Sequence, residues 1–273
     1  MRKHLWWAIC VMLLISITVI SWKPTNATKN IEVKTVPAGA KEYFEQYVNS
    51  IYQVAQLQQT GMNVAVLQKA LTGYLNLKLE NKLPENSNII TVVDFSKSSR
   101  EKRMWIIDVL NKTLLLNTWV AHGQGSGDDM ATMFSNTNES HQSSLGFYLT
   151  EDVYMGKHGR SLRLNGLDEG INSAALARGI VVHAADYVGQ GAINAMGRLG
   201  RSFGCPAVSP EVSNMVINTI KGHSMMFIHG NSSTYTSKLL DETAPMNYLM
   251  PVAKVDTTHL ADNSNIDTNA VVK

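Results

Sequence analysis

Seven short apolar segments between residues 89 and 230 constrain the fold of this chain more than any other feature of its sequence. Each is rich in β-branched or aromatic side chains and is bounded by polar or glycine-containing turns. Segments of this length and composition predict β-strands, because helices need about 10 residues or more. The predicted strands span residues 89–95, 104–110, 113–121, 144–150, 161–166, 180–185 and 225–230.

Two longer segments ahead of the strands have the period of a helix. In residues 41–58 and again in residues 62–79, apolar side chains recur at spacings of three and four, with Thr60-Gly61 as a break between them. Shorter helices are expected at 172–179 and at 210–221, where a proline occupies the first turn. The expected fold is mainly β within the α+β class, with mixed sheets, a few short helices and an N-terminal helical hairpin.

The first 27 residues have the layout of a secretory signal peptide. Arg2 and Lys3 are followed by an apolar run from Leu5 to about Trp22 and then by small or polar residues up to Ala27. An uncleaved single-span anchor is the alternative, because the apolar run approaches the length that spans a bilayer. In both cases we expect the rest of the chain to be exported to the periplasm or cell envelope, with membrane contact only through this segment.

The chain divides by composition into five parts. Residues 28–40 are predicted to be a linker, residues 41–82 an N-terminal helical element and residues 83–230 the strand-rich domain, while residues 231–273 lose periodicity and predict a largely flexible tail. Residues 1–27 hold three of the 24 basic residues and none of the 22 acidic ones, so the remainder carries a net charge of −1. Without clustered Lys and Arg, no nucleic-acid surface is expected.

Cys205 is the first candidate for chemistry. If residues 1–27 are removed, Cys10 is lost and Cys205 is the only remaining cysteine. An unpaired cysteine in an oxidising compartment indicates intermolecular pairing or a reactive thiol. Cys205 lies between Gly204 and Pro206, in a setting that predicts a tight turn with the amides of Gly204 and Cys205 free to bind a developing oxyanion.

A reactive thiol needs a base, and His183 is the candidate. It ends the apolar run IVVHAA, so a rigid strand end can bring its imidazole to the sulfur of Cys205. The alternative for a lone histidine is a core residue bound to a backbone carbonyl. Arg201 could bind a carboxylate or favour the thiolate, or else be a solvated turn residue. Asp186 is close to His183 in sequence but is expected to point to the opposite face of the strand.

The other candidates carry weaker signals. His122 begins a glycine-rich loop that is either a wall of the site or a flexible tip, and Tyr187 is either a packing residue or a substrate contact. The loop lacks the Gly-Lys-Ser/Thr of a phosphate cradle. Because the histidines show neither HExxH nor CxxC spacing, we expect no metal site and no cofactor.

Several of these residues together resemble a known family. His183, Ser202, Gly204 and Cys205 match the signature of the bacterial L,D-transpeptidases, in which a histidine precedes a Ser/Thr-His-Gly-Cys motif. Phe203 stands where that signature has its second histidine. The motif GRSFGCPA at 200–207 is similar to the Gly-Arg-Ser-x-Gly-Cys-Pro-Ala of a divergent branch, the murein L,D-transpeptidase catalytic domain family. The resemblance extends from about Gly61 to about Gly230.

The resemblance implies a mixed β sandwich or barrel and a role in the bacterial cell wall. In such enzymes the cysteine attacks the third residue of a peptidoglycan tetrapeptide stem, releases D-alanine and holds the stem as a thioester. An amine from a second stem then gives a 3→3 cross-link, and water gives L,D-carboxypeptidase activity instead. Cys205, His183, Gly204 and Ser202 are the expected catalytic residues. Arg201, His122 and Tyr187 are the expected substrate contacts. A non-catalytic wall-binding module and an exported cysteine peptidase remain the alternatives.

Overall fold

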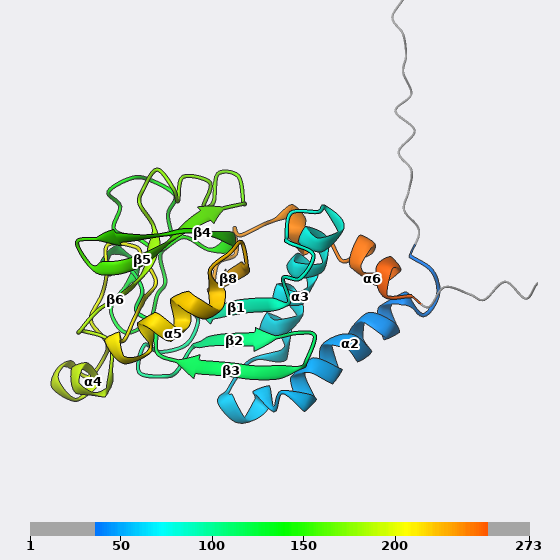
Figure 1. The fold of residues 1–273 in the computed structure, drawn as a ribbon, viewed down its shortest axis with the longest axis horizontal. Helices are drawn as coiled ribbons and strands as arrows, with labels where there is room; N and C mark the ends of the chain where they lie inside the picture. The colour runs from blue at the N-terminus through cyan, green and yellow to red at the C-terminus, as the bar shows by residue number, and fades with distance from the viewer. Residues whose placement is uncertain (1–35, 251–273) are drawn as a thin grey trace, which may run out of the picture. The chain divides into compact units, whose positions relative to one another are not determined.

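The computed structural model describes residues 36–250 (Figure 1). The predicted signal segment, most of the predicted linker and residues 251–273 of the predicted tail lie outside the described residues. Within 36–250, no helix combines the length and the apolar character needed to cross a membrane. The helices are α2 (Ala40–Val54), α3 (Val64–Leu79), α4 (Gln190–Met196), α5 (Pro210–Ile220) and α6 (Thr243–Leu249), with short 3-10 turns η1 (Leu57–Thr60), η2 (Gln124–Ser126) and η3 (Lys238–Leu240).

Eight strands form one mixed sheet in the order β3-β2-β1-β8-β4-β5-β6-β7. Their bounds are β1 (Ile89–Asp94), β2 (Met104–Asp108), β3 (Thr113–Thr118), β4 (Gly146–Gly156), β5 (Gly159–Gly166), β6 (Val181–Ala184), β7 (Ala207–Val208) and β8 (Met225–His229). The pairs β1–β8 and β6–β7 are parallel and the others antiparallel. The predicted mixed sheet is therefore confirmed, and all seven predicted strands are present.

The two ends of this strand order meet. Ala121, just beyond β3, donates its N–H to the carbonyl of Ala207 in β7 at 2.8 Å, and the reciprocal bond is 3.4 Å. This bridge nearly closes the sheet into a barrel, which removes most of the exposed strand edge. It also brings the segment after β3 beside the segment that carries Cys205.

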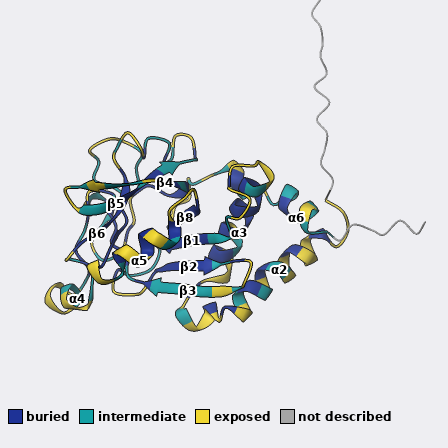
Figure 2. Ribbon diagram, viewed as in Figure 1, coloured by how far each residue is buried: buried dark blue, intermediate teal, exposed yellow. Residues whose placement is uncertain are grey.

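Two apolar clusters hold the sheet to the helices. One joins α2, α3 and α6 to β1, β2 and β8, and the other packs α5 against the strands around β5 and β6. The buried residues form a continuous band through the central strands (Figure 2). Gly73 of α3 is required for the close approach of this helix, since a Cβ there would lie 2.0 Å from the ring of Phe147.

Residues 172–179, predicted to be a helix, form a series of turns instead. The side chain of Asn172 explains the difference. Its amide donates to the carbonyls of Leu145 and Phe147 at 2.9 and 3.0 Å, and its oxygen accepts from the Asp168 N–H at 2.8 Å. An asparagine that satisfies distant backbone groups in this way competes with helix formation.

Sequence periodicity also missed the ordered segments η3 and α6. Asn76 of α3 donates to the carbonyls of Leu239 and Asp241 at 3.0 and 2.8 Å, and Asp168 accepts a hydrogen bond from the Tyr235 hydroxyl at 3.0 Å. Residues 235–241 are thus tied to both α3 and the loop after β5. These long-range polar contacts leave no periodic signal in the local sequence.

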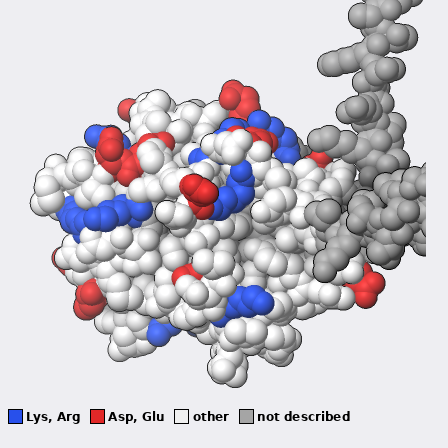
Figure 3. Space-filling view, turned by 45° about the vertical axis from the view of Figure 1, so that its right-hand side comes forward, with Lys and Arg blue, Asp and Glu red and all other residues white. Residues whose placement is uncertain are grey.

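Charged side chains are dispersed over the surface. On the face shown in Figure 3, Lys and Arg lie in small groups separated by Asp and Glu. The ion pairs within residues 36–250 are mostly exposed, such as Lys41–Glu45 at 3.8 Å, and exposed pairs contribute little stability.

Candidate active site

Cys205 lies in the turn just ahead of β7, beside β6. The register pairs His183 of β6 with Ala207 of β7, so the thiol is two residues upstream of the strand position that faces the histidine. Its Sγ accepts a hydrogen bond from the Val181 N–H at 3.4 Å and donates to the Gly179 carbonyl at 3.7 Å. The side chain is partly buried and unpaired. The fold therefore brings Cys205, in the turn ahead of β7, beside the neighbouring strand β6 that carries His183.

His183 is buried, with an exposed fraction of 2%. Its Nδ1 lies 2.8 Å from the Ala184 carbonyl. Because a carbonyl only accepts, Nδ1 carries the proton and the neutral ring has Nε2 as its basic nitrogen. The sequence did not reveal this orienting group, since any residue at 184 supplies the same carbonyl. His158, at the tip of the β4–β5 hairpin, stacks on His183 with ring centroids 4.4 Å apart.

No hydrogen bond joins Cys205 to His183 in the described part of the chain. The sulfur instead contacts the backbone of Val181, which is two residues before His183 and on the same face of β6. Residues spaced by two along a strand are about 6.6 Å apart. Catalytic hydrogen bonds are often long in the absence of substrate and tighten when substrate binds, so this geometry is compatible with a nucleophile and its base.

Both side chains are uncharged near neutral pH. Burial raises the pKa of the Cys205 thiol, and the Val181 N–H, Arg178 and Lys157 offset part of that rise. Burial also lowers the pKa of His183; the hydrogen bond to Ala184 opposes this, while His158 and Lys157 lower it further. A neutral thiol and a neutral imidazole favour proton transfer during attack over a preformed thiolate–imidazolium pair.

The turn before Cys205 is held by Ser202. Its hydroxyl donates to the Cys205 carbonyl at 2.6 Å and accepts from the Gly204 N–H at 3.1 Å. The amide of Gly204, expected from the sequence to be free, is therefore already engaged. Within the described residues, the Cys205 N–H has no acceptor and remains available to an oxyanion. Gly204 has a φ of +119°, and a Cβ there would lie 2.8 Å from the Gln142 carbonyl.

The glycine-rich loop packs directly against this turn. Gly123 donates its N–H to the Ser143 hydroxyl at 3.0 Å, and that hydroxyl donates to the Gly204 carbonyl at 3.2 Å. A Cβ at Gly123 would lie 2.3 Å from the His141 carbonyl and 2.8 Å from the Gly204 Cα. Three backbone segments thus meet at a distance that only glycine permits, and the loop is a packed wall beside the turn that precedes Cys205.

Arg178 is a site residue that the sequence analysis missed. It is partly buried and donates to the Gln142 carbonyl at 2.6 Å, the Ser144 hydroxyl at 2.7 Å and the Ser135 carbonyl at 2.8 Å. The same guanidinium lowers the pKa of Cys205. Arg178 therefore fixes the 135–144 segment over the site and places a positive charge near the sulfur. The only sequence signal was a basic residue directly ahead of the IVVHAA strand.

His122 is placed differently from His183. It is fully buried, and Arg103 donates to its Nδ1 at 2.7 Å, while its carbonyl accepts from the Ser202 N–H at 3.0 Å. Burial and the positive charge of Arg103 lower the pKa of His122 to about 4, and the nearby backbone of Gly127 offsets part of the shift. Its backbone supports the nucleophile turn, and its imidazole belongs to a buried cluster with Arg103 and Phe95.

Arg201 and Tyr187 flank the site through other contacts. Arg201 donates to the Gly127 carbonyl at 2.8 Å and lies 3.2 Å from an Asp128 carboxylate oxygen, so its guanidinium is directed at the glycine-rich loop. Tyr187 packs against Gly200, where a Cβ would approach the tyrosine Cβ to 2.4 Å. Burial, together with the charge of a Cys205 thiolate, raises the pKa of Tyr187 to about 12. Both residues lie beside the turn that precedes Cys205.

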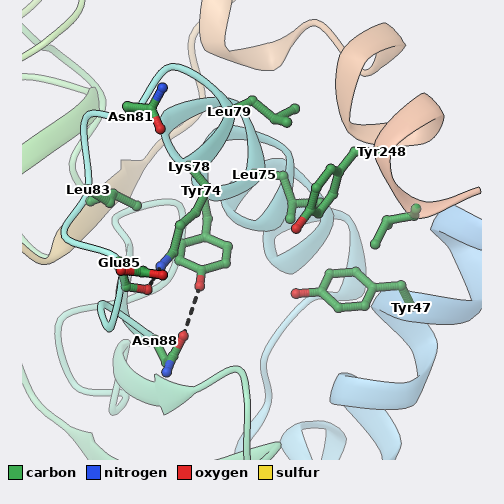
Figure 4. A pocket seen from close by; sticks show the side chains of 11 residues that line it. Tyr47, Tyr74, Leu75, Lys78, Leu79, Asn81, Leu83, Glu85, Asn88 and Tyr248 are labelled. Atoms are coloured by element: carbon green, nitrogen blue, oxygen red, sulfur yellow. Dashed lines mark hydrogen bonds between the residues drawn. The ribbon is translucent and has the colours of Figure 1, made fainter.

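A cavity of about 580 Å³ opens away from these residues, between α2, α3 and α6 (Figure 4). Tyr47, Tyr74 and Tyr248 line it, and the Tyr74 hydroxyl donates to the Ser87 carbonyl at 3.0 Å. None of the predicted site residues lines this cavity. In residues 36–250, no group of three or more His, Cys, Asp or Glu side chains is arranged to hold a metal ion.

Comparisons with known proteins add the following. A search of curated proteins finds no match. An L,D-transpeptidase from Mycobacterium smegmatis matches 52% of this chain and 59% of its own, at 11% identity and a TM-score of 0.33. An L,D-transpeptidase from Xylanimonas cellulosilytica matches 54% of this chain and 63% of its own, at 14% identity and a TM-score of 0.33. An L,D-transpeptidase from Stackebrandtia nassauensis matches 73% of this chain and 95% of its own, at 12% identity and a TM-score of 0.33.

The chain thus spans about three fifths of the first two of these structures. The family model of the L,D-transpeptidase catalytic domain matches residues 58–229, which is more than half of the chain and includes both Cys205 and His183. The chain therefore belongs to the L,D-transpeptidase catalytic domain family.

Proposed function

We propose that this protein is an exported, cysteine-dependent L,D-transpeptidase that acts on the tetrapeptide stems of peptidoglycan. Family membership supports the reaction class. The observation that carries the proposal is the placement of Cys205 in the turn directly ahead of β7, against the strand β6 that carries His183. His183 is fixed by the Ala184 carbonyl, so that Nε2 is its basic nitrogen. This arrangement supplies a nucleophile, a base and an orienter for that base.

In the first half-reaction, His183 Nε2 accepts the thiol proton as Sγ of Cys205 attacks the carbonyl carbon of the third stem residue. The Cys205 N–H stabilises the resulting oxyanion, since the Gly204 N–H is bound to Ser202. When the tetrahedral intermediate collapses, the bond to the terminal D-alanine breaks. The protonated His183 returns the proton to the leaving amine, and the stem remains as a thioester on Cys205.

In the second half-reaction, an amine of a second stem attacks the thioester. His183, again neutral, accepts a proton from that amine, and the thiol leaves and recovers its proton. The product is a 3→3 cross-link. Attack by water in place of the amine gives L,D-carboxypeptidase activity, so the two reactions share the acyl-enzyme and differ in the acceptor.

Substitution of the two residues tests this mechanism. Cys205→Ala and His183→Ala should each reduce D-alanine release from purified tetrapeptide muropeptides by at least about 10³-fold. His223→Ala is a matched control because His223 is an exposed histidine outside the site, paired with Glu151 at 3.5 Å. Mass spectrometry separates cross-linked dimers from trimmed monomers. Full activity in either site variant, with thermal unfolding as in the parent, would refute the mechanism.

A non-catalytic wall-binding module is the second candidate. The observations that favour it are the raised pKa of Cys205 and the absence of a Cys205–His183 hydrogen bond within the described residues. Alkylation with iodoacetamide across pH separates the two. A catalytic thiol should react faster in the parent than in His183→Ala, whereas an inert module should show the same slow rate in both proteins.

A further inference from the structure

An aromatic pair lies next to the nucleophile turn. The rings of His141 and Phe203 stack with centroids 4.3 Å apart and an interplanar angle of 19°. Phe203, two residues before Cys205, has an exposed fraction of 61%, which is high for a phenylalanine. The pair therefore presents a flat surface to solvent beside the sulfur.

The imidazole of His141 has a defined hydrogen-bonding state. The side-chain amide of Gln124 lies 3.0 Å from Nδ1 through its nitrogen. Since that nitrogen only donates, Nδ1 accepts, and the neutral ring carries its proton on Nε2. The pair thus offers a phenyl face together with one N–H donor that Gln124 leaves free.

The loop holds His141 in an unfavourable backbone conformation. Its φ is +54°, which costs a residue other than glycine about 1 kcal/mol or more. The backbone around it is clamped, because the His141 carbonyl accepts from the Gly125 N–H at 2.9 Å and Arg178 donates to the Gln142 carbonyl at 2.6 Å. Strain that the surrounding contacts maintain beside a nucleophile indicates a functional position.

We propose that His141 and Phe203 form a subsite for the peptide stem beside Cys205. Phe203 is the apolar platform, and His141 supplies from a different loop the imidazole that the L,D-transpeptidase signature carries at position 203. Its Nε2–H donates to a backbone carbonyl of the bound stem, which makes His141 a positioning residue. The proposal rests on the proposed function in one respect: the ligand is a peptidoglycan stem peptide.

The principal test uses His141→Asn, because asparagine tolerates positive φ while it removes the ring. The KM for a tetrapeptide muropeptide should rise about tenfold, with kcat within about twofold of the parent, as expected for loss of one hydrogen bond and part of an apolar contact. His141→Phe keeps a stacked ring without the donor and should raise KM by a similar factor. His223→Asn is the matched control, since His223 also has positive φ, at 62°, and lies outside the site.

The decisive variant is His141→Asn combined with Phe203→His. It replaces the phenyl ring by an imidazole at position 203, where the L,D-transpeptidase signature carries one, and should recover at least half of the lost kcat/KM. The proposal would be overturned if the double variant had no higher kcat/KM than His141→Asn. It would also be overturned if His141→Phe had the same KM as the parent. If the ring of His141 only stabilised the loop, His141→Asn would lower the unfolding temperature, and the double variant would not recover kcat/KM.

Binding measured without catalysis separates this proposal from the proposed function. In a Cys205→Ala background, titration calorimetry with the same muropeptide should show about tenfold weaker binding when His141→Asn is added. If the parent protein releases no D-alanine but the Cys205→Ala protein shows His141-dependent binding, the enzyme is overturned and the subsite remains. Binding that is undetectable, or indifferent to His141→Asn, would overturn the subsite.

Discussion

Two buried histidines lie on either side of β7 and differ in what their rings can do. Ala207 of β7 pairs with His183 on one side and, through the bridge that nearly closes the sheet, with Ala121, the residue before His122, on the other. Their exposed fractions are 2% and 0%. Proximity to β7 and burial therefore do not distinguish them.

The hydrogen bond at Nδ1 does distinguish them. In His183, Nδ1–H donates to a carbonyl and Nε2 is a base. In His122, Nδ1 accepts from Arg103, and Nε2 carries the proton and has no partner in the described part of the chain. Burial lowers the pKa of both rings, yet only His183 keeps its basic nitrogen available. A buried histidine is thus a candidate base only when its other nitrogen is a donor.

The largest effect on stability should come from Arg103, which fixes the state of His122. Arg103→Met leaves the Val120 carbonyl and His122 Nδ1 without their donors, at 3.1 and 2.7 Å in the parent. The free energy of unfolding should fall by about 3–5 kcal/mol, measured by urea denaturation. Lys102→Met is the neighbouring control, because Lys102 is exposed and its loss should change stability by less than about 0.5 kcal/mol.

If Arg103→Met had the same free energy of unfolding as the parent, the buried cation would be dispensable for stability. The comparison between the two histidines would then fail, since nothing else on the His122 ring would separate it from His183.

A smaller effect is expected where the glycine-rich loop meets the nucleophile turn. Gly123→Ala places a Cβ 2.3 Å from the His141 carbonyl, so the two backbone segments must separate. Overpacking of this kind costs about 1–3 kcal/mol and should also displace the Ser202–Cys205 turn. Gly222→Ala is the control for the added Cβ, because nothing lies within 4 Å of it. Unlike Gly123, whose φ is −71°, Gly222 has a φ of +89°, so its substitution adds backbone strain but no steric contact.

Gly123→Ala should therefore lower D-alanine release per folded molecule, while Gly222→Ala should lower stability alone. Equal release in both variants would mean that the loop does not support the turn.

Much of the fold could be predicted because its signals are local. The seven strands and the helices α2, α3 and α5 each carry the apolar period of their own element. Cys205 and His183 could be proposed because an unpaired cysteine in a chain predicted to be exported indicates a reactive thiol, which needs a base. Strand β7 was missed because two residues cannot show a period, and η3 because its anchors, such as Asn76, lie far away in the sequence.

The rest of the site could not be predicted because it depends on contacts between distant segments. The orienter of His183 is a backbone carbonyl, which no residue type encodes. Arg178 acts through loop carbonyls more than 30 residues upstream, and His141 meets Phe203 across 62 positions. Only a folded structure shows that Gly123 and Gly204 let these segments touch.

The smallest effect concerns the charges that lower the two histidine pKa values. For His122 the second cause after burial is the buried Arg103, whereas for His183 the cations are exposed ones on the β4–β5 hairpin, His158 and Lys157. A histidine with a lowered pKa remains neutral, and therefore basic, down to a lower pH. The acid limb of the pH profile of kcat/KM should therefore have its midpoint below pH 6.5. Lys157→Met removes a positive charge, which raises the pKa of His183.

The acid limb of Lys157→Met should therefore move to higher pH by a few tenths of a pH unit, with Lys221→Met as a control away from the site. The alkylation pKa of Cys205 should rise as well, since Lys157 lowers it. Because salt screens exposed charges far more than buried ones, 1 M KCl should move the parental limb in the same direction and shrink the difference between parent and variant. A limb that stays in place both in Lys157→Met and in 1 M KCl would assign the lowered pKa of His183 to burial alone and refute the role of the exposed charges.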